Sequence, residues 1–244
     1  SLYLPWSEKL IKKYKNKWDW TGLSGNRGLP WTVGLIERYE RKWDWTGLSG
    51  NRGLPWTVEL IEEYIDKWNW KKLSGNIGLP WNEEFFYKYF NKWDWQYISE
   101  NRRLPWTREL IDKNNWNFQG LSGNRAIPWT VELIERYERK WDWIVLSGND
   151  SLPWSIELIE KYKSLWKWGD PIFNRHMYNN QSFSTRSLTL NKGIPWSIEL
   201  IEKYENKWNW YMLAVNHSVW DMAVKPYIND KSIEMVMDRI GIND

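Results

Sequence analysis

Residues 55–79 read PWTVELIEEYIDKWNWKKLSGNIGL, and this stretch is one copy of a pattern that recurs along the chain of 244 residues. Its opening Pro-Trp pair returns at intervals of 25, 25, 25, 25, 23, 25 and 42 residues. The prolines that mark the copies are Pro5, Pro30, Pro55, Pro80, Pro105, Pro128, Pro153 and Pro195. Some copies are nearly perfect, since residues 17–33 are identical to residues 42–58. A fixed period of this length is typical of a repeat protein.

The first half of the repeat predicts an amphipathic helix. Thr57 is suited to cap its start, because a threonine hydroxyl accepts a hydrogen bond from a free amide of the first turn. Leu60, Ile61, Tyr64 and Trp68 then recur at helical spacing and form one apolar stripe. We expect a helix of about 11 residues whose charged side chains face solvent.

The second half predicts a shorter helix. Asn69, replaced by Asp in several repeats, can cap it, and Trp70 and Leu73 provide its apolar side. Gly75 is expected to end it in the left-handed conformation, which glycine adopts at little cost. No part of the repeat alternates apolar and polar residues with period two, so no strand is expected.

Two helices this short cannot bury their own tryptophans, but stacked neighbours can. The sequence therefore predicts an all-α fold, an α-helical solenoid of eight tandem 25-residue helix-turn-helix repeats over residues 1–219. An insertion of 17 residues interrupts the seventh repeat at about residues 169–185, and residues 220–244 are expected to form a C-terminal cap with a short closing helix from Ser232. The repeat is smaller than the tetratricopeptide (about 34 residues) and ankyrin (about 33 residues) repeats.

The invariant residues are interpreted as structural. The 24 Trp residues include two that recur in all eight repeats, as Trp56 and Trp68 do in the third, and we expect both in the core. The second Trp of each Trp-Asp-Trp triplet, such as Trp45, is also interpreted as core, with partial exposure as the alternative because it lies in the shorter helix. An Asn also recurs in every repeat. Its amide could hydrogen-bond to the loop backbone of the neighbouring repeat and form a structural ladder, or it could bind a ligand. The structural ladder is favoured, because Asn side chains commonly bond to the backbone in turns.

The variable residues are where recognition could lie. The residue after the invariant Asn is basic in five repeats, and we expect these side chains to line one edge of the stack; Ile77, Asp150 and His217 interrupt the series. The five basic candidates are Arg27, Arg52, Arg102, Arg125 and Lys192. The insertion adds Arg175, His176 and Tyr178 as possible contact residues, because long loops inside compact arrays are often functional.

Composition argues against several classes of function. The chain has no Cys and only 2 His, so it offers no thiol nucleophile, disulfide framework or thiolate metal site. No phosphate-binding loop, paired carboxylates or metal-ligand spacing occurs, and the repeated Ser-Gly is interpreted as a helix end. We therefore expect no enzyme activity, cofactor or metal. The absence of an apolar leader and of any long apolar run predicts a cytoplasmic protein without a membrane span.

The expected function is a non-catalytic recognition scaffold that binds another protein along an extended repeat surface. An alternative is binding of single-stranded nucleic acid through the basic edge, although 34 Lys and Arg against 31 Asp and Glu is a small excess for a phosphate binder. A third hypothesis is a structural or self-assembling array, because the sequence begins within a repeat and an uncapped repeat exposes an apolar face.

Overall fold

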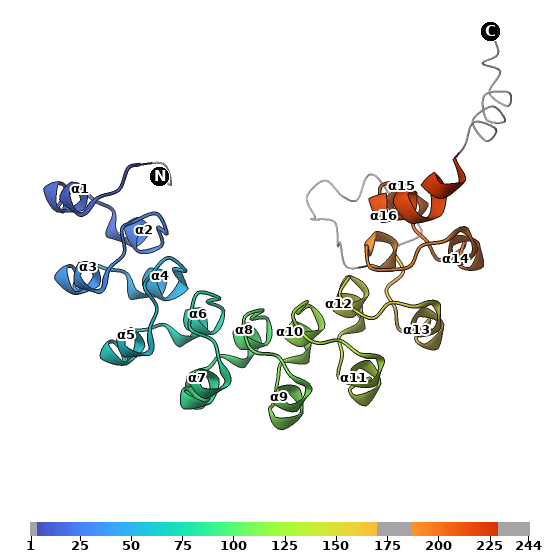
Figure 1. Cartoon of the computed structure of the whole chain (residues 1–244), viewed down its shortest axis with the longest axis horizontal. Helices are drawn as coiled ribbons and strands as arrows, with labels where there is room; N and C mark the ends of the chain where they lie inside the picture. Colours follow the sequence, from blue (N-terminus) through green and yellow to red (C-terminus); the bar gives the residue numbers. More distant parts are fainter. Residues whose placement is uncertain (1–3, 170–186, 229–244) are drawn as a thin grey trace, which may run out of the picture. The chain divides into compact units, whose positions relative to one another are not determined.

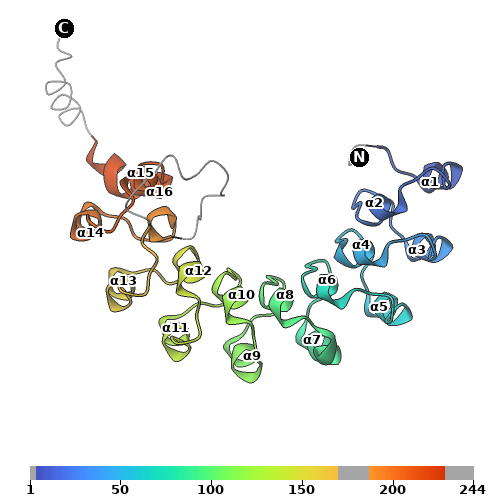
Figure 2. The same cartoon turned by 180° about the vertical axis from the view of Figure 1, so that it is seen from behind.

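The computed structural model describes residues 4–169 and 187–228, and within these residues every regular element is helical. Short helices follow one another in tandem pairs and pack regularly against their neighbours, which confirms the helical-repeat solenoid. The chain divides into two compact halves, residues 1–128 and residues 129–244. In the N-terminal half α1, α3, α5, α7 and α9 form one row and α2, α4, α6, α8 and α10 a second (Figure 1, and from behind Figure 2).

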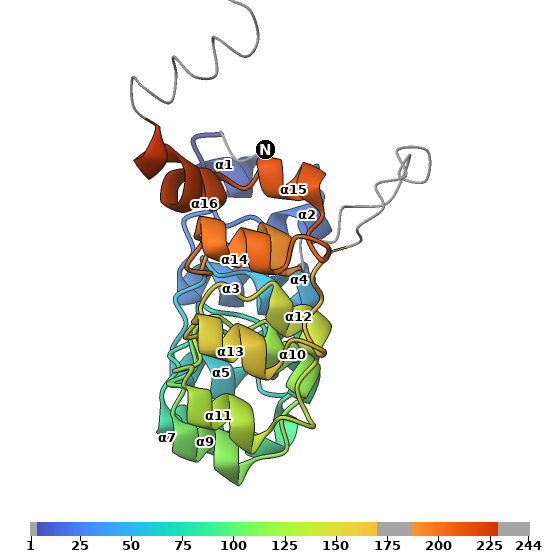
Figure 3. The same ribbon diagram turned by 90° about the vertical axis from the view of Figure 1, so that its right-hand side faces the viewer.

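The first helix of each repeat begins at a capping hydroxyl or amide. The Oγ1 of Thr57, for example, accepts a hydrogen bond from the backbone N–H of Leu60 at 3.2 Å. The eight first helices are α1 (Glu8–Lys13), α3 (Val33–Arg38), α5 (Val58–Glu63), α7 (Glu83–Lys88), α9 (Arg108–Lys113), α11 (Val131–Arg136), α13 (Ile156–Lys161) and α14 (Ile198–Lys203). In the C-terminal half α11, α13 and α14 lie side by side (Figure 3).

These helices are shorter than the sequence predicts, with 6 residues rather than about 11. The chain leaves the helix at Tyr64, whose φ is −118° and ψ 31°. A continued helix would pair the carbonyl of Ile61 with the N–H of Ile65. Here the indole Nε1 of Trp68 donates to that carbonyl at 3.1 Å. The invariant Trp68 thus occupies the carbonyl that a longer helix would use, although its helical spacing predicts that it continues the helix.

The second helices begin at an Asp or Asn cap, and they are α2 (Trp20–Ser24), α4 (Trp45–Gly50), α6 (Trp70–Ser74), α8 (Trp95–Ser99), α10 (Phe118–Ser122), α12 (Trp143–Ser147) and α15 (Trp210–Ala214). The prediction of a left-handed glycine at their ends is wrong. Gly75 has φ −90°, and Glu100 occupies the same position in the fourth repeat with φ −86°. Glycine is therefore dispensable for this helix end.

Aromatic rings form the core between successive repeats. Trp56 and Trp68 pack together within the third repeat, with ring centroids 5.0 Å apart. Trp45 of the preceding repeat lies 4.9 Å from both Tyr64 and Trp68, edge-on to the latter. Trp56, Tyr64 and Trp68 are all buried. Such pairs add about 0.5–1.5 kcal/mol each to the burial of apolar area, so stacking of the repeats supplies the core, as predicted.

The insertion interrupts the second helix of the seventh repeat. Trp168, where the second helix would begin, and Gly169 have no regular secondary structure, and the helical segment that follows the insertion is the 3₁₀ helix η2 (Leu188–Leu190). The N–H of Leu188 donates to the carbonyl of Lys167 at 2.8 Å, as the N–H of Leu48 does to the carbonyl of Asp44 in an intact repeat. The helical hydrogen bond is thereby retained across the insertion.

The remaining elements are η1 (Phe90–Lys92), after α7, and three short helices that follow α15, namely α16 (His217–Val219), the π-helix η3 (Trp220–Val224) and the 3₁₀ helix η4 (Lys225–Tyr227). Of these, η3 and η4 lie within residues 220–244, where the C-terminal cap is predicted, and α16 directly precedes them. The closing helix expected from Ser232 lies outside the described residues.

Candidate recognition surface

The invariant asparagines form a ladder of hydrogen bonds between repeats. The Nδ2 of Asn76 donates to the carbonyls of Ser49, at 2.9 Å, and Asn51, at 3.4 Å, both in the preceding repeat. Its Oδ1 accepts from the N–H of Gly78 at 2.9 Å. Asn76 is buried, so its amide is fully used inside the protein. The prediction of a structural ladder is confirmed, and the buried amide is not available to read a ligand.

The ladder also fixes where the next residue lies. A Cβ on Gly53 would lie 2.8 Å from the carbonyl oxygen and 3.1 Å from the Cα of Arg27, and a Cβ on Gly78 would lie 3.1 Å from the Cα of Arg52. Successive loops are therefore in van der Waals contact, and the residues after the asparagines follow one another along one edge. We call the series in the N-terminal half the loop row: Arg27, Arg52, Ile77, Arg102 and Arg125.

The C-terminal half has a less basic series. Asp150 is half-buried, and Lys192 and His217 are exposed. The structure thus brings four of the five predicted basic residues together in the loop row and places Lys192 in the other half. The other candidates, Arg175, His176 and Tyr178, lie outside the described residues.

Charged side chains on the first helices form ion pairs with the first helices of neighbouring repeats. Lys88 Nζ lies 2.5 Å from Glu62 Oε1, and Arg38 Nη1 lies 2.8 Å from Glu8 Oε2. The same kind of pair joins Lys203 to Glu160 in the C-terminal half. These ion pairs explain why the exposed face of the first helices carries both acidic and basic residues: the opposite charges join neighbouring repeats.

Three of the four arginines of the loop row lack such partners among the described residues. Over residues 4–169 and 187–228, no carboxylate lies within ion-pair distance of Arg27, Arg52 or Arg102, and all three are exposed. A guanidinium carries five N–H donors in a fixed planar arrangement that matches a carboxylate. The edge therefore presents unpaired cations that are available to an external anionic group.

A hollow of about 350 Å³ interrupts the loop row. Its wall includes Ile77, and the phenol ring of Tyr97 completes the apolar part. The Nζ of Lys71 lies 5.0 Å from the centroid of that ring, a cation–π contact that orients it. The residues that line the hollow are Arg52, Gly75, Ile77, Tyr97, Glu100, Asn101 and Arg102.

The sequence reasoning above missed Tyr97 as a candidate contact residue. The equivalent residues in the first three repeats are Gly22, Gly47 and Lys72, so this position varies as strongly as the loop row does. That variation was the available signal. What it could not reveal is that a side chain on the second helix reaches the loop edge.

The partly exposed tryptophans are covered on their outer faces. Trp45 is half-buried, which agrees with the alternative of partial exposure for the second Trp of the triplet and not with a fully buried core position. Besides its contacts with Tyr64 and Trp68, the Nζ of Lys67 lies 5.2 Å from its ring. Lys42 covers Trp20 and Lys92 covers Trp70 in the same way. These indoles are therefore poor platforms for stacking an external base or sugar.

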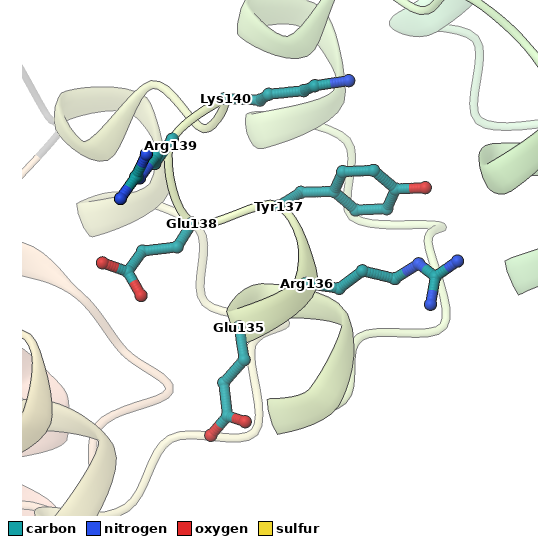
Figure 4. Close-up of a pocket in the computed structure, with 6 residues that line it drawn as sticks. All are labelled: Glu135, Arg136, Tyr137, Glu138, Arg139 and Lys140. Carbon is teal, nitrogen blue, oxygen red and sulfur yellow. The ribbon is translucent and has the colours of Figure 1, made fainter.

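A second hollow, of about 390 Å³, lies against the turn after α11 in the C-terminal half. Figure 4 shows that the side chains around it diverge: Arg136, Tyr137 and Lys140 extend to one side of the turn, and Glu138 and Arg139 to the other. The groups do not converge on a point where a reacting atom could be held, which catalysis requires.

In the described part of the chain, no cluster of three or more His, Cys, Asp or Glu side chains is suited to hold a metal ion. None of the helices in residues 4–169 and 187–228 combines the length and apolar character needed to cross a bilayer.

Comparison of the chain with protein-family models, curated proteins and solved structures finds no match in any of the three. The fold is a helical-repeat solenoid rich in tryptophan, and its best-defined surface is the loop row. A proposal of function therefore depends on the geometry of this chain.

Proposed function

We propose that this protein is a non-catalytic recognition scaffold that binds another protein along the loop row. The observation that carries the proposal is that Arg27, Arg52 and Arg102, from three different repeats, are exposed and have no carboxylate partner among the described residues, beside a hollow with an apolar wall. Helical-repeat proteins commonly bind partners along extended surfaces, with contacts distributed over several repeats. The scaffold is built from invariant residues, so substitutions in the row can alter specificity without disturbing the fold.

The geometry favours a protein over a single-stranded nucleic acid. A single strand is usually bound by aromatic rings that stack on bases beside a basic track. Here Trp20, Trp45 and Trp70 are covered by lysines. In addition, Glu100 lies among the residues of the hollow, where it would repel a continuous line of phosphates.

Selection from a random peptide library tests the proposal. The wild-type chain should enrich a family of related acidic peptides, and replacement of Arg27, Arg52, Arg102 and Arg125 by Ala should abolish the enrichment. A matched control replaces four exposed basic residues of the first helices and their following turns by Ala: Lys9, Lys12, Lys17 and Arg41. Both variants lose four positive charges, from +3 to −1.

The control variant should enrich the same peptides as the wild type. Equal enrichment by the loop-row variant, or no enrichment by the wild type, would contradict the proposal. A parallel mobility-shift assay with single-stranded oligonucleotides at low and high salt tests the nucleic-acid alternative, because phosphate contacts weaken steeply with salt.

A further inference from the structure

The loop row has an internal pattern that a partner must match. Arg27 and Arg52 come from neighbouring repeats, Ile77 follows, and Arg102 resumes the basic series on the far side of the hollow. Arg52 and Arg102 both line the hollow, with Ile77 and Tyr97 between them. The row therefore presents two cations, an apolar recess and a third cation, in that order.

The spacing of this pattern agrees with an extended polypeptide. Packed helices are about 8–10 Å apart, which sets the approximate distance between successive repeats. A chain in the extended polyproline II conformation advances about 3.1 Å per residue and makes one turn in three residues. About three residues of such a chain therefore span one repeat, and every third side chain would face a residue of the loop row.

Charge determines which side chains fit. Carboxylates complement Arg27, Arg52 and Arg102, which have no ion-pair partner among the described residues. At the recess, Glu100 disfavours a further negative charge, whereas Ile77 and Tyr97 can bury an apolar side chain. The volume of about 350 Å³ is near the lower end of the range of about 300–1,000 Å³ usual for ligand pockets.

We infer that the loop row binds an acidic peptide segment in the extended polyproline II conformation, with acidic residues at about positions 1, 4 and 10 and a bulky apolar residue at position 7, or the same order reversed. This inference rests on the proposed function and specifies the chemistry of the partner. The acidic side chains pair with the three arginines, and the apolar side chain fills the recess between Arg52 and Arg102.

Fluorescence anisotropy with labelled synthetic peptides of about ten residues tests the inference on the full chain. The patterned peptide has Asp facing each arginine, Leu facing the recess and Ser or Gly elsewhere, and it is made in both directions. A clustered peptide has the same composition with the three Asp adjacent. A third peptide replaces Leu by Ser, and a thymidine oligonucleotide of about 20 residues represents nucleic acid.

One direction of the patterned peptide should bind roughly tenfold more tightly than the clustered peptide, because only it can engage all three cations and the recess. The double variant Arg52→Ala with Arg102→Ala should weaken binding by a similar factor. The control Lys12→Ala with Arg41→Ala should leave it within about twofold. Ile77→Asp should remove the advantage of Leu over Ser, and circular dichroism checks that each variant remains folded.

Each contrary result has a distinct meaning. If the clustered peptide binds as tightly and still depends on Arg52 and Arg102, the inferred spacing is overturned while protein recognition by the loop row stands. If none of the peptides binds at up to about 1 mM, the inference is overturned, and the library selection alone decides the proposed function. Tighter binding of the oligonucleotide, lost in the double variant, would overturn both.

Discussion

At the scale of single residues, each ladder asparagine joins two repeats and one turn. The carbonyl of Asn51 accepts from the indole Nε1 of Trp56 at 2.8 Å and from the Nδ2 of Asn76 at 3.4 Å. The loop thus has its buried polar groups satisfied by the next turn and the next repeat. A buried polar group without a partner costs about 1–3 kcal/mol, so these side chains stabilise the loops that carry the arginines.

Asn76→Ala should lower the free energy of unfolding by about 2–4 kcal/mol, because it leaves the carbonyl of Ser49 and the N–H of Gly78 without their partner. Urea denaturation measures the change. Asn16→Ala, at an exposed position, serves as the control and should stay within about 0.5 kcal/mol of the wild type. A loss for Asn76→Ala no larger than that of the control would show that the ladder adds nothing to stability.

Replacement by Ala should change the stability of the protein in opposite directions at two glycines. Gly169 has φ 143°, and an added Cβ would lie 2.9 Å from Thr189 Oγ1, so Gly169→Ala should destabilise the protein by about 1–3 kcal/mol. Gly34 lies in α3 with no atom within 4 Å of an added Cβ, so Gly34→Ala should stabilise by about 0.5–1 kcal/mol. Thermal melting of both variants shows whether each melting temperature falls or rises relative to the wild type.

At the scale of elements, a second helix gains most of its stability from the repeat that follows it. Trp45 and Trp210 make the same local bond, since the indole Nε1 of each donates to a carbonyl five residues earlier. Their surroundings differ. Trp45 packs on Tyr64 and Trp68, whereas Trp210 is 55% exposed, and among the described residues no ring or lysine covers it.

Replacing each of these two tryptophans by Ala distinguishes the stability that comes from contacts within a repeat from the stability that comes from contacts with the next repeat. Trp45→Ala should reduce the free energy of unfolding by about 3–5 kcal/mol, as for other large aromatic side chains in cores. Trp210→Ala should reduce it by a smaller amount, about 1–2 kcal/mol, because Trp210 is 55% exposed and less apolar area is lost from the folded protein. Guanidinium denaturation compares the variants, and similar losses for both would refute the inter-repeat origin of the core.

The ion pair between Glu160 of α13 and Lys203 of α14 should make the stability of the protein depend on pH. The ammonium of Lys203 hydrogen-bonds to Glu160 and lowers the pKa of that carboxyl from 4.5 to about 2. A carboxyl whose pKa is lower in the folded state stabilises the protein above its unfolded pKa, and this stabilisation disappears as the pH falls through the folded pKa.

Glu160→Gln should therefore lower the melting temperature at pH 7, and the difference from wild type should shrink between pH 4.5 and pH 2. Melting curves at several pH values follow the difference. Glu202→Gln, an exposed position in α14, is the control and should change the melting temperature little. A difference that persists at pH 2 would exclude ionisation of Glu160 as the cause.

At the scale of the whole molecule, the repeat is the unit of construction. Stability in such proteins is approximately a sum of repeat and neighbour terms. Deletion of residues 56–80 removes one period and rejoins Pro55 to Trp81, which restores the Pro-Trp pair. Trp45 can then stack on Tyr89 and Trp93, the equivalents of Tyr64 and Trp68 in the next repeat.

The shortened chain should fold with unchanged mean residue ellipticity and lose a few kcal/mol of stability at most. Deletion of residues 56–68 should instead abolish cooperative melting, because it removes Tyr64 and Trp68 without a replacement. Circular dichroism and thermal melting test both variants. If the two deletions behaved alike, the 25-residue period would not be the folding unit.

Much of the fold follows from the sequence because each invariant residue samples the same environment several times. Periodicity identified the helix pairs, the stacked tryptophan core and the asparagine ladder, since these features need only the pattern of one repeat and the presence of a neighbour. The residue type at each variable position also located the basic series that became the loop row.

Only the tertiary structure decided features that depend on which atoms meet across repeats. It showed that Trp68 ends the first helix by binding the carbonyl of Ile61, and that Gly75 remains right-handed. It separated the paired charges of the first helices from Arg27, Arg52 and Arg102, which have no ion-pair partner among the described residues, and it placed Tyr97 at the hollow. The period of the sequence indicates that each repeat has neighbours. The geometry of the hydrogen bonds and the positions that side chains can reach depend on how these neighbours pack together.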